Sequence, residues 1–194
     1  MRLIVFLAAL VGVALLGGCA TLSEAECEAR DWRSIGLNDG ANGRAASYID
    51  NHISACAEYG IVVDRQLYEA GRSEGLRAFC RLDNAAARGR TGESYNSVCA
   101  GELGVAFRIV YDEARDIYEV NQLIMRARTQ LDEALVRITN PATPQEQLPA
   151  IRLEVLRLQT EITRLENQLR REEDQLLQAL TAQRARLERL GITA

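Results

Sequence analysis

The stretch IRLEVLRLQTEITRLENQL (residues 151–169) decides the fold. Its apolar residues recur at steps of three and four, which is typical of an α-helix that packs along a second helix. The members of this seam are Leu148, Ile151, Val155, Leu158, Ile162, Leu165 and Leu169. A second seam with the same steps precedes it, formed by Leu103, Phe107, Val110, Ala114, Ile117, Asn121, Ile124, Arg128, Leu131, Leu135 and Ile138. Two such seams predict an all-α fold.

The two seams are separated by the sequence NPATP (residues 140–144). Proline cannot continue a helix and restricts the residue before it, so this segment predicts a turn at 140–145. Two helices of similar length joined by a short turn are typical of an antiparallel pair. Residues 102–190 therefore predict a coiled-coil-like antiparallel hairpin, in which Leu131 meets Val155.

The composition is that of a globular protein, with 47% apolar and 26% charged residues. All of the 23 basic residues are arginine, and the formal net charge is −4 with both signs mixed along the chain. A nucleic-acid-binding protein usually carries a basic patch or stripe, and none is visible in this sequence. No nucleic-acid partner is therefore expected.

The N-terminus has the pattern of a secretory signal peptide. One arginine is followed by the apolar run Leu3–Leu16 and by the small residues of LGGC (residues 16–19). LGGC also resembles the bacterial lipobox, which implies cleavage after residue 18 and attachment of lipid, including palmitate, to Cys19. The expected arrangement is a cleaved signal peptide at 1–18 and a lipidated tether at 19–23. An ordinary signal peptide, or a membrane-spanning helix with a chance cysteine, is the alternative.

Two or three acyl chains would anchor the protein stably to a membrane. The residue after the lipobox cysteine is Ala20, and not the aspartate that usually retains lipoproteins in the inner membrane. The expected location is the cell envelope, on the inner leaflet of the outer membrane, facing the periplasm.

Four further cysteines follow, at Cys27, Cys56, Cys80 and Cys99. An even number in an exported chain predicts two disulfides, for which three connectivities exist. The pairing suggested by the duplicated layout described below is local, Cys27–Cys56 and Cys80–Cys99. The cysteines are spaced too widely for a usual zinc site, and free buried thiols are the other alternative.

Residues 24–101 form a glycine-rich module that contains a degenerate duplication. The motif GLNDG (residues 36–40) recurs as GRSEG (residues 71–75). Glycines four residues apart lie on one helix face and allow close backbone approach at a tight helix crossing. The same segments could instead line a small polar site, whose candidate residues are Trp32, Asp39, Arg44, Arg72 and Glu74.

The module resembles a proteobacterial lipoprotein family that is catalogued only as a domain of unknown function. The resemblance covers about residues 23–118 and rests on Cys27-x3-Asp31-Trp32-x2-Ile35-Gly36-x2-Asp39-Gly40 with the three later cysteines. It implies an exported lipoprotein with a small cysteine-bearing module, and it implies no reaction. The sequence departs from the family at two turns, where prolines often found before Asp64 and after Cys99 are absent.

Catalytic patterns are sparse. The one histidine, His52, lies four residues before Cys56, and a Cys–His pair would require a free thiolate. Because Cys56 is expected in a disulfide, His52 is interpreted as a packing or capping residue. No catalytic residue, metal site or cofactor is predicted.

Two functions are compatible with these patterns. The first is a non-enzymatic envelope lipoprotein whose hairpin binds a periplasmic protein or self-associates. The second is a lipoprotein that binds or hydrolyses cell-wall material through the polar site. A pocket with converging polar groups would favour the second function, and a closely packed glycine interior would favour the first.

Overall fold

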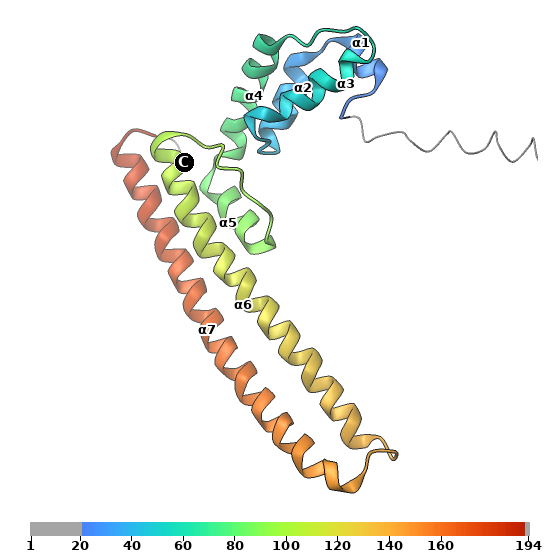
Figure 1. The fold of residues 1–194 in the computed structure, drawn as a ribbon. Helices are drawn as coiled ribbons and strands as arrows, with labels where there is room; N and C mark the ends of the chain where they lie inside the picture. The colour runs from blue at the N-terminus through green and yellow to red at the C-terminus, as the bar shows by residue number, and fades with distance from the viewer. Residues whose placement is uncertain (1–20, 193–194) are drawn as a thin grey trace, which may run out of the picture. The chain divides into compact units, whose positions relative to one another are not determined.

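The computed structural model describes residues 21–192 (Figure 1). The described residues form helices and connecting segments without strands, as predicted. They divide into two compact units, which we call the N-terminal unit (residues up to Leu76) and the C-terminal unit (from Arg77). The predicted signal peptide and Cys19 lie outside the described residues. Within the described part of the chain, no helix is long and apolar enough to span a membrane.

The N-terminal unit is built from short helices with side-chain caps. Its α-helices are α1 (Glu24–Ala29), α2 (Trp32–Ala41), α3 (Ile49–Ala57) and most of α4 (Arg65–Phe79). Ser23 and Glu26 form a capping box at α1, and the Asp31 carboxylate accepts a hydrogen bond from the Ser34 amide at α2. Asp64 accepts from the Leu67 amide at 3.0 Å and so caps α4.

The duplicated glycine motifs form one tight crossing between α2 and α4. A Cβ atom on Gly36 or Gly40 would lie 2.0 or 2.2 Å from a carbonyl oxygen of α4. A Cβ atom on Gly71 or Gly75 would lie 1.9 or 2.1 Å from a carbonyl oxygen of α2. Only glycine permits this approach, so the motifs act as the packing contacts that the sequence suggested.

The crossing has an approximate two-fold symmetry that extends to the flanking side chains. Tyr68, three residues before Gly71, donates a 2.7 Å hydrogen bond to Asp39, three residues after Gly36. At the equivalent positions, Arg33 donates a 2.8 Å hydrogen bond to Glu74. The first pair is buried, whereas the Arg33 and Glu74 side chains are exposed.

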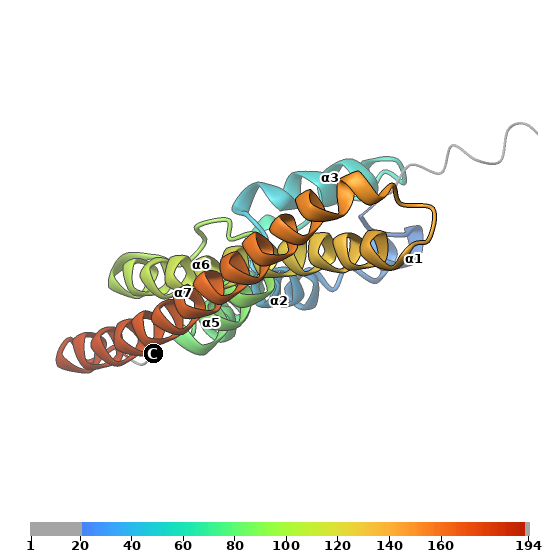
Figure 2. The same ribbon diagram turned by 90° about the horizontal axis from the view of Figure 1, so that it is seen from below.

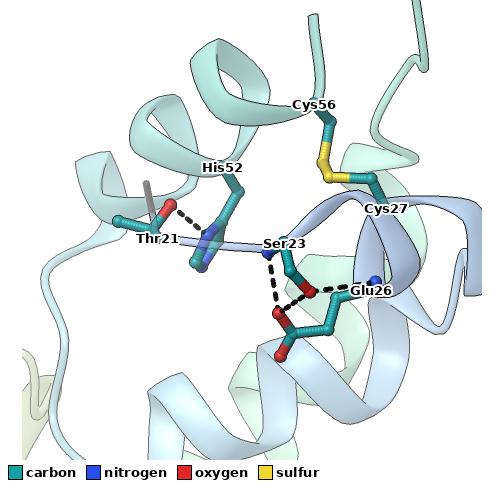
Figure 3. The surroundings of a disulfide bond; sticks show 6 residues. All are labelled: Thr21, Ser23, Glu26, Cys27, His52 and Cys56. Carbon is teal, nitrogen blue, oxygen red and sulfur yellow. Dashed lines mark hydrogen bonds between the residues drawn. A yellow bond between two sulfur atoms is a disulfide. The ribbon is translucent and has the colours of Figure 1, made fainter. Parts of the chain in front are cut away.

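The core of the N-terminal unit surrounds the first disulfide. Cys27 and Cys56 are bonded and fully buried (Figure 3). They pack with the buried residues Leu22, Trp32, Ile49, Val63 and Tyr68. The second predicted pair, Cys80–Cys99, is also present and lies in the C-terminal unit. The structure therefore contains both predicted disulfides.

Loss of the first disulfide should destabilise the N-terminal unit. The bond spans 29 residues, and closing a loop of this length stabilises a fold by about 3–4 kcal/mol on the chain-entropy model. The double variant Cys27→Ser, Cys56→Ser should therefore unfold at lower denaturant concentration. Fluorescence of Trp32, the single tryptophan of the chain, reports on this core. An unchanged Trp32 transition would contradict the expectation.

The C-terminal unit consists mainly of three helices, α5 (Leu82–Thr91), α6 (Gly101–Thr139) and α7 (Leu148–Arg189). Helices α6 and α7 run side by side in opposite directions (Figure 1), and α7 passes in front of α6 in the view from below (Figure 2). One cluster between them contains Ile124, Leu165 and Ile162, and another contains Val155 and Leu131. The predicted antiparallel hairpin and its register are therefore present, with the turn at 140–147.

The division into units differs from the boundary at 101/102 that the sequence indicated, because α5 packs on α6. A Cβ atom on Gly89 of α5 would lie 2.5 Å from the Tyr111 carbonyl oxygen of α6. Four aromatic rings also pack together in this region, in stacked or tilted pairs, those of Phe79, Tyr95, Phe107 and Tyr111. Together with the Cys80–Cys99 bond, these contacts join residues 77–101 to the hairpin.

Acidic side chains gather where α6 and α7 meet. Burial raises the pKa of the Glu113 carboxyl, and the negative charges of Asp116 and Glu172 raise it further. Burial likewise raises the pKa of Asp116, with Glu172 again contributing. The charged forms of these two carboxyls are therefore disfavoured in the folded hairpin.

This arrangement predicts a pH dependence. Because the folded pKa values of Glu113 and Asp116 lie above the unfolded ones, the folded state binds these two protons more tightly, and the contribution of this pair of carboxyls to hairpin stability rises as the pH falls towards their pKa values. Glu172→Gln should raise stability at pH 7 and reduce the gain on acidification, as measured by urea unfolding followed by circular dichroism. Glu188→Gln, at an exposed position on α7, is the control. Equal pH profiles for the two variants would contradict the prediction.

Candidate functional site

The most distinctive polar feature of the N-terminal unit is a chain of four side chains from four segments. His52 of α3 lies between Thr21 and Asp39: its Nδ1 is 2.9 Å from the Thr21 Oγ1, and its Nε2 is 2.7 Å from the Asp39 Oδ2. Tyr68 of α4 donates to the same Asp39 oxygen at 2.7 Å. We call Thr21, His52, Asp39 and Tyr68 the buried polar chain. It connects the segment before α1 to helices α2, α3 and α4.

The donor and acceptor roles follow from the chemistry of the groups. A carboxylate can only accept, so the His52 Nε2 carries a proton and donates to Asp39. In the neutral imidazole the Nδ1 then accepts from the Thr21 hydroxyl. Burial, and next the hydrogen bond to Asp39, raise the pKa of the Tyr68 hydroxyl well above its ordinary value. Tyr68 therefore remains a protonated donor at any physiological pH.

The buried polar chain is shielded from solvent by the residues around it. The exposed fractions of Asp39, His52 and Tyr68 are 6%, 3% and 0%. The His52 ring also has aromatic neighbours, with the centroid of the Tyr48 ring at 5.2 Å and that of Tyr68 at 5.8 Å. These side chains satisfy one another's hydrogen-bonding groups, which offsets the cost of burying them.

The five candidate residues from the sequence do not converge on one site. Asp39 lies in the buried polar chain, but Trp32 is 3% exposed and packs in the apolar core. Glu74 points to the surface, where it pairs with Arg33 at 2.8 Å. The two glycine motifs that contain Asp39 and Glu74 share a spacing because they form the crossing between α2 and α4.

Arg44 and Arg72 lie close together at one edge of the unit. Arg72 is 8% exposed, and its Nη2 donates to the Arg44 carbonyl oxygen at 2.9 Å. The Arg44 guanidinium carbon lies 4.6 Å from the centroid of the Tyr48 ring, in a cation–π contact. The Arg72 guanidinium thus fixes the backbone of the loop that carries Arg44.

A hydroxyl, an imidazole and a carboxylate in series resemble the arrangement of a hydrolase triad. Catalysis would further require space for a substrate beside the hydroxyl and donors for the developing oxyanion. A hollow of about 440 Å³ in this unit is lined by Arg30, Trp32, Val62, Val63, Asp64 and Leu67. It includes no member of the buried polar chain. The geometry therefore supports a structural connection among four segments.

Residues 21–23, which the sequence assigned to the lipidated tether at 19–23, are part of the fold. Thr21 contacts His52, Leu22 is 6% exposed in the core, and Ser23 caps α1. Figure 3 shows His52 between Thr21 and the Cys27–Cys56 disulfide. The physical reason is that Leu22 and Thr21 each find a buried partner in α3 or its neighbours.

Part of the chain matches a known protein-family model. Residues 31–116 match the family model described as Protein of unknown function (DUF2799). The resemblance to a domain of unknown function, inferred from the sequence, is confirmed. No curated protein and no solved structure matches the chain. The DUF2799 segment contains Asp39, His52 and Tyr68, together with the four glycines of the crossing.

The sequence placed Asp39 among the candidate site residues and indicated His52 as a packing or capping residue, but it did not indicate a role for Tyr68 or Thr21. The burial of His52 between Thr21 and Asp39 fits a packing role. A signal for Tyr68 existed, because it precedes Gly71 by the same three residues by which Arg33 precedes Gly36. Nothing local in the sequence joins Thr21 to His52, since their contact depends on how α1 packs against α3.

Removal of the Tyr68 hydroxyl should weaken the N-terminal unit without emptying its core. Tyr68→Phe keeps the ring but deprives the buried Asp39 carboxylate of one donor, and an unmet buried group costs about 1–3 kcal/mol. The Trp32 unfolding transition should shift accordingly. Tyr59→Phe, in an exposed tyrosine, is the matched control, and equal transitions for both variants would count against the buried polar chain.

Proposed function

We propose that this protein is a non-enzymatic envelope lipoprotein, anchored through Cys19 and facing the periplasm, whose helical hairpin binds a protein partner. The observation that carries the proposal is the closed interior of the N-terminal unit. The members of its buried polar chain are hydrogen-bonded to one another, and its glycines bring helix backbones into contact. This is the packed interior that favours an interaction protein over a ligand-binding or hydrolytic one.

The hairpin supplies the second line of support. Between its helices it buries Leu158, Leu165 and Leu176, which are at most 4% exposed. On the outside of α7, Leu153 and Leu156 are 68% and 59% exposed. These two residues are three positions apart and therefore adjacent on the helix surface. Exposed apolar neighbours on a long helix are suited to contact another protein.

Two ion pairs link α6 to α7 without involving Leu153 or Leu156. Arg137 pairs with Glu154 at 2.7 Å, and Arg128 pairs with Glu166 at 2.8 Å, each across the two helices. These exposed pairs fix the register more than they stabilise the hairpin. The buried leucines and ion pairs named here join α6 to α7, and the exposed Leu153 and Leu156 are not among them.

Site-specific photocrosslinking in intact envelopes tests the proposal. A photoreactive residue at Leu153 or Leu156 should give adducts of discrete mass, either with a partner or with a second copy. The same residue at Thr181, an exposed polar position on α7, is the control and should give far less. Absence of adducts at both leucines would contradict a role for this surface in protein binding.

A further inference from the structure

The first described residues enter the fold immediately. Thr21 is hydrogen-bonded to His52, Leu22 is buried, and the Ser23–Glu26 capping box begins α1. The Cys27–Cys56 bond then attaches α1 to α3 covalently. From Thr21 onward, the chain is therefore held by hydrogen bonds, apolar contacts and a disulfide.

The lipobox leaves almost no chain between the acyl group and this fold. Only Ala20 separates Cys19 from Thr21. An extended chain advances at most about 3.6 Å per residue, so the Cα atoms of Cys19 and Thr21 lie within roughly 7 Å of each other. A lipid attached to Cys19 would bring the Thr21 end of the fold to the membrane surface.

The side chains at this end are suited to a lipid headgroup layer. The described chain runs from Cys27, which is bonded to Cys56, back to Thr21, which lies beside His52 (Figure 3). The Tyr48 ring packs on His52, and the exposed Arg44 guanidinium covers Tyr48. Tyrosine rings partition to the headgroup level, and arginine pairs with lipid phosphates.

Acidic residues moderate the electrostatic attraction. Glu24 and Glu28 are exposed on α1, close in sequence to Thr21, and they would repel anionic lipids. The contact therefore depends on the short connection to the anchor, with Tyr48 and Arg44 as the headgroup-facing side chains.

We propose that the N-terminal unit sits directly on the lipid headgroup layer, with Thr21, Tyr48 and Arg44 facing it and no flexible tether between the acyl chains and the fold. This inference rests on the proposed lipid anchor at Cys19. It implies that the membrane surface fixes the orientation of the N-terminal unit.

Tryptophan quenching in vesicles tests the orientation. The acylated full-length protein is reconstituted in phosphatidylethanolamine–phosphatidylglycerol vesicles that contain a lipid spin-labelled at the headgroup. Tyr48→Trp and Tyr59→Trp add a second tryptophan just beyond either end of α3, roughly 16 Å apart at 1.5 Å per residue. The natural sequence, which contains Trp32 alone, gives the baseline quenching that is subtracted from each variant. Quenching at position 48 should be about twofold stronger than at position 59, since aromatic side chains at the interface lie at headgroup depth.

A tether insertion provides the matched control. About twelve Gly and Ser residues inserted between Ala20 and Thr21 give a flexible link of roughly 20 Å and should abolish the difference in quenching. The natural sequence and the insertion variant, each without a tryptophan substitution, are then treated with proteinase K. The N-terminal unit should be released from vesicles for the insertion variant and retained for the natural sequence.

The outcomes separate this inference from the proposed function. Equal quenching at positions 48 and 59 would overturn the proposed contact of the N-terminal unit with the headgroup layer. Release of this unit from the natural sequence as readily as from the insertion variant would overturn it too. In either case, flotation of the protein with vesicles would still support the lipid anchor. Failure of the natural chain to float with vesicles would overturn the lipid anchor and this inference together.

Discussion

Gly71→Ala is expected to destabilise the N-terminal unit strongly while the hairpin remains helical. The new Cβ atom would lie 1.9 Å from the Arg33 carbonyl oxygen and 2.9 Å from the Leu37 backbone nitrogen. Both are backbone atoms of α2, so α2 and α4 must separate to admit the methyl group. Overpacking of a well-packed core usually costs about 1–3 kcal/mol, and contact with backbone places this variant at or above the upper end.

Two spectroscopic signals distinguish the units. Trp32 fluorescence follows the N-terminal core, whereas far-ultraviolet circular dichroism is dominated by the long helices α6 and α7. Gly71→Ala should shift the Trp32 transition to much lower denaturant and leave most of the helical signal. Ser73→Ala, at an exposed position on the same helix, should leave both unchanged. A Trp32 transition in Gly71→Ala equal to that of the natural sequence would show that the crossing is looser than described.

Leu165→Asp should have the converse effect. Leu165 is 2% exposed in the cluster with Val120, Ile124 and Ala127. The substitution removes a large buried side chain and introduces a carboxylate without a partner, which together cost about 3 kcal/mol or more. The central part of the hairpin should lose helicity and protease resistance, while the Trp32 signal is retained.

Leu153→Asp is the matched control for this variant. It makes the same change on the same helix, but at a side chain that is 68% exposed. Helicity and protease resistance should be preserved, whereas photocrosslinks from neighbouring Leu156 should decrease if the surface binds a partner. Loss of helicity to the same extent in both variants would contradict the assignment of Leu165 to the buried seam between α6 and α7 and of Leu153 to the exposed surface.

The hairpin was largely predictable because its pattern is local and repeated. Steps of three and four in residues 148–169 place Ile151, Val155 and Leu158 on the buried face. In α6 the predicted seam followed the large residues and included Leu135, which is 42% exposed. The structure instead buries Ala127 and Ala134, at 6% and 0%. Small side chains allow the helices to approach, and hydropathy alone gives them little weight.

The candidate site was predictable only in part. The glycine motifs indicated a close crossing, and the even number of cysteines indicated two disulfides. Which polar residues are buried depends on tertiary packing: Asp39 and Glu74 occupy equivalent positions in the duplication, yet only Asp39 lies beneath α3 and next to His52. Spacing along the chain could not distinguish these two carboxylates. The boundary between the units also depends on long-range contacts of α5 with α6.

The most direct test of the proposed function is the mass of the N-terminal peptide of the protein isolated from membranes. A lipid anchor at Cys19 predicts that this peptide begins at Cys19 and carries a diacylglycerol on its thiol, with or without a further acyl chain on its amine. It also predicts that the Cys19→Ser chain lacks this mass and does not fractionate with membranes. An N-terminal peptide that begins elsewhere, or a Cys19 without acyl mass in membrane-bound protein, would contradict the lipoprotein assignment.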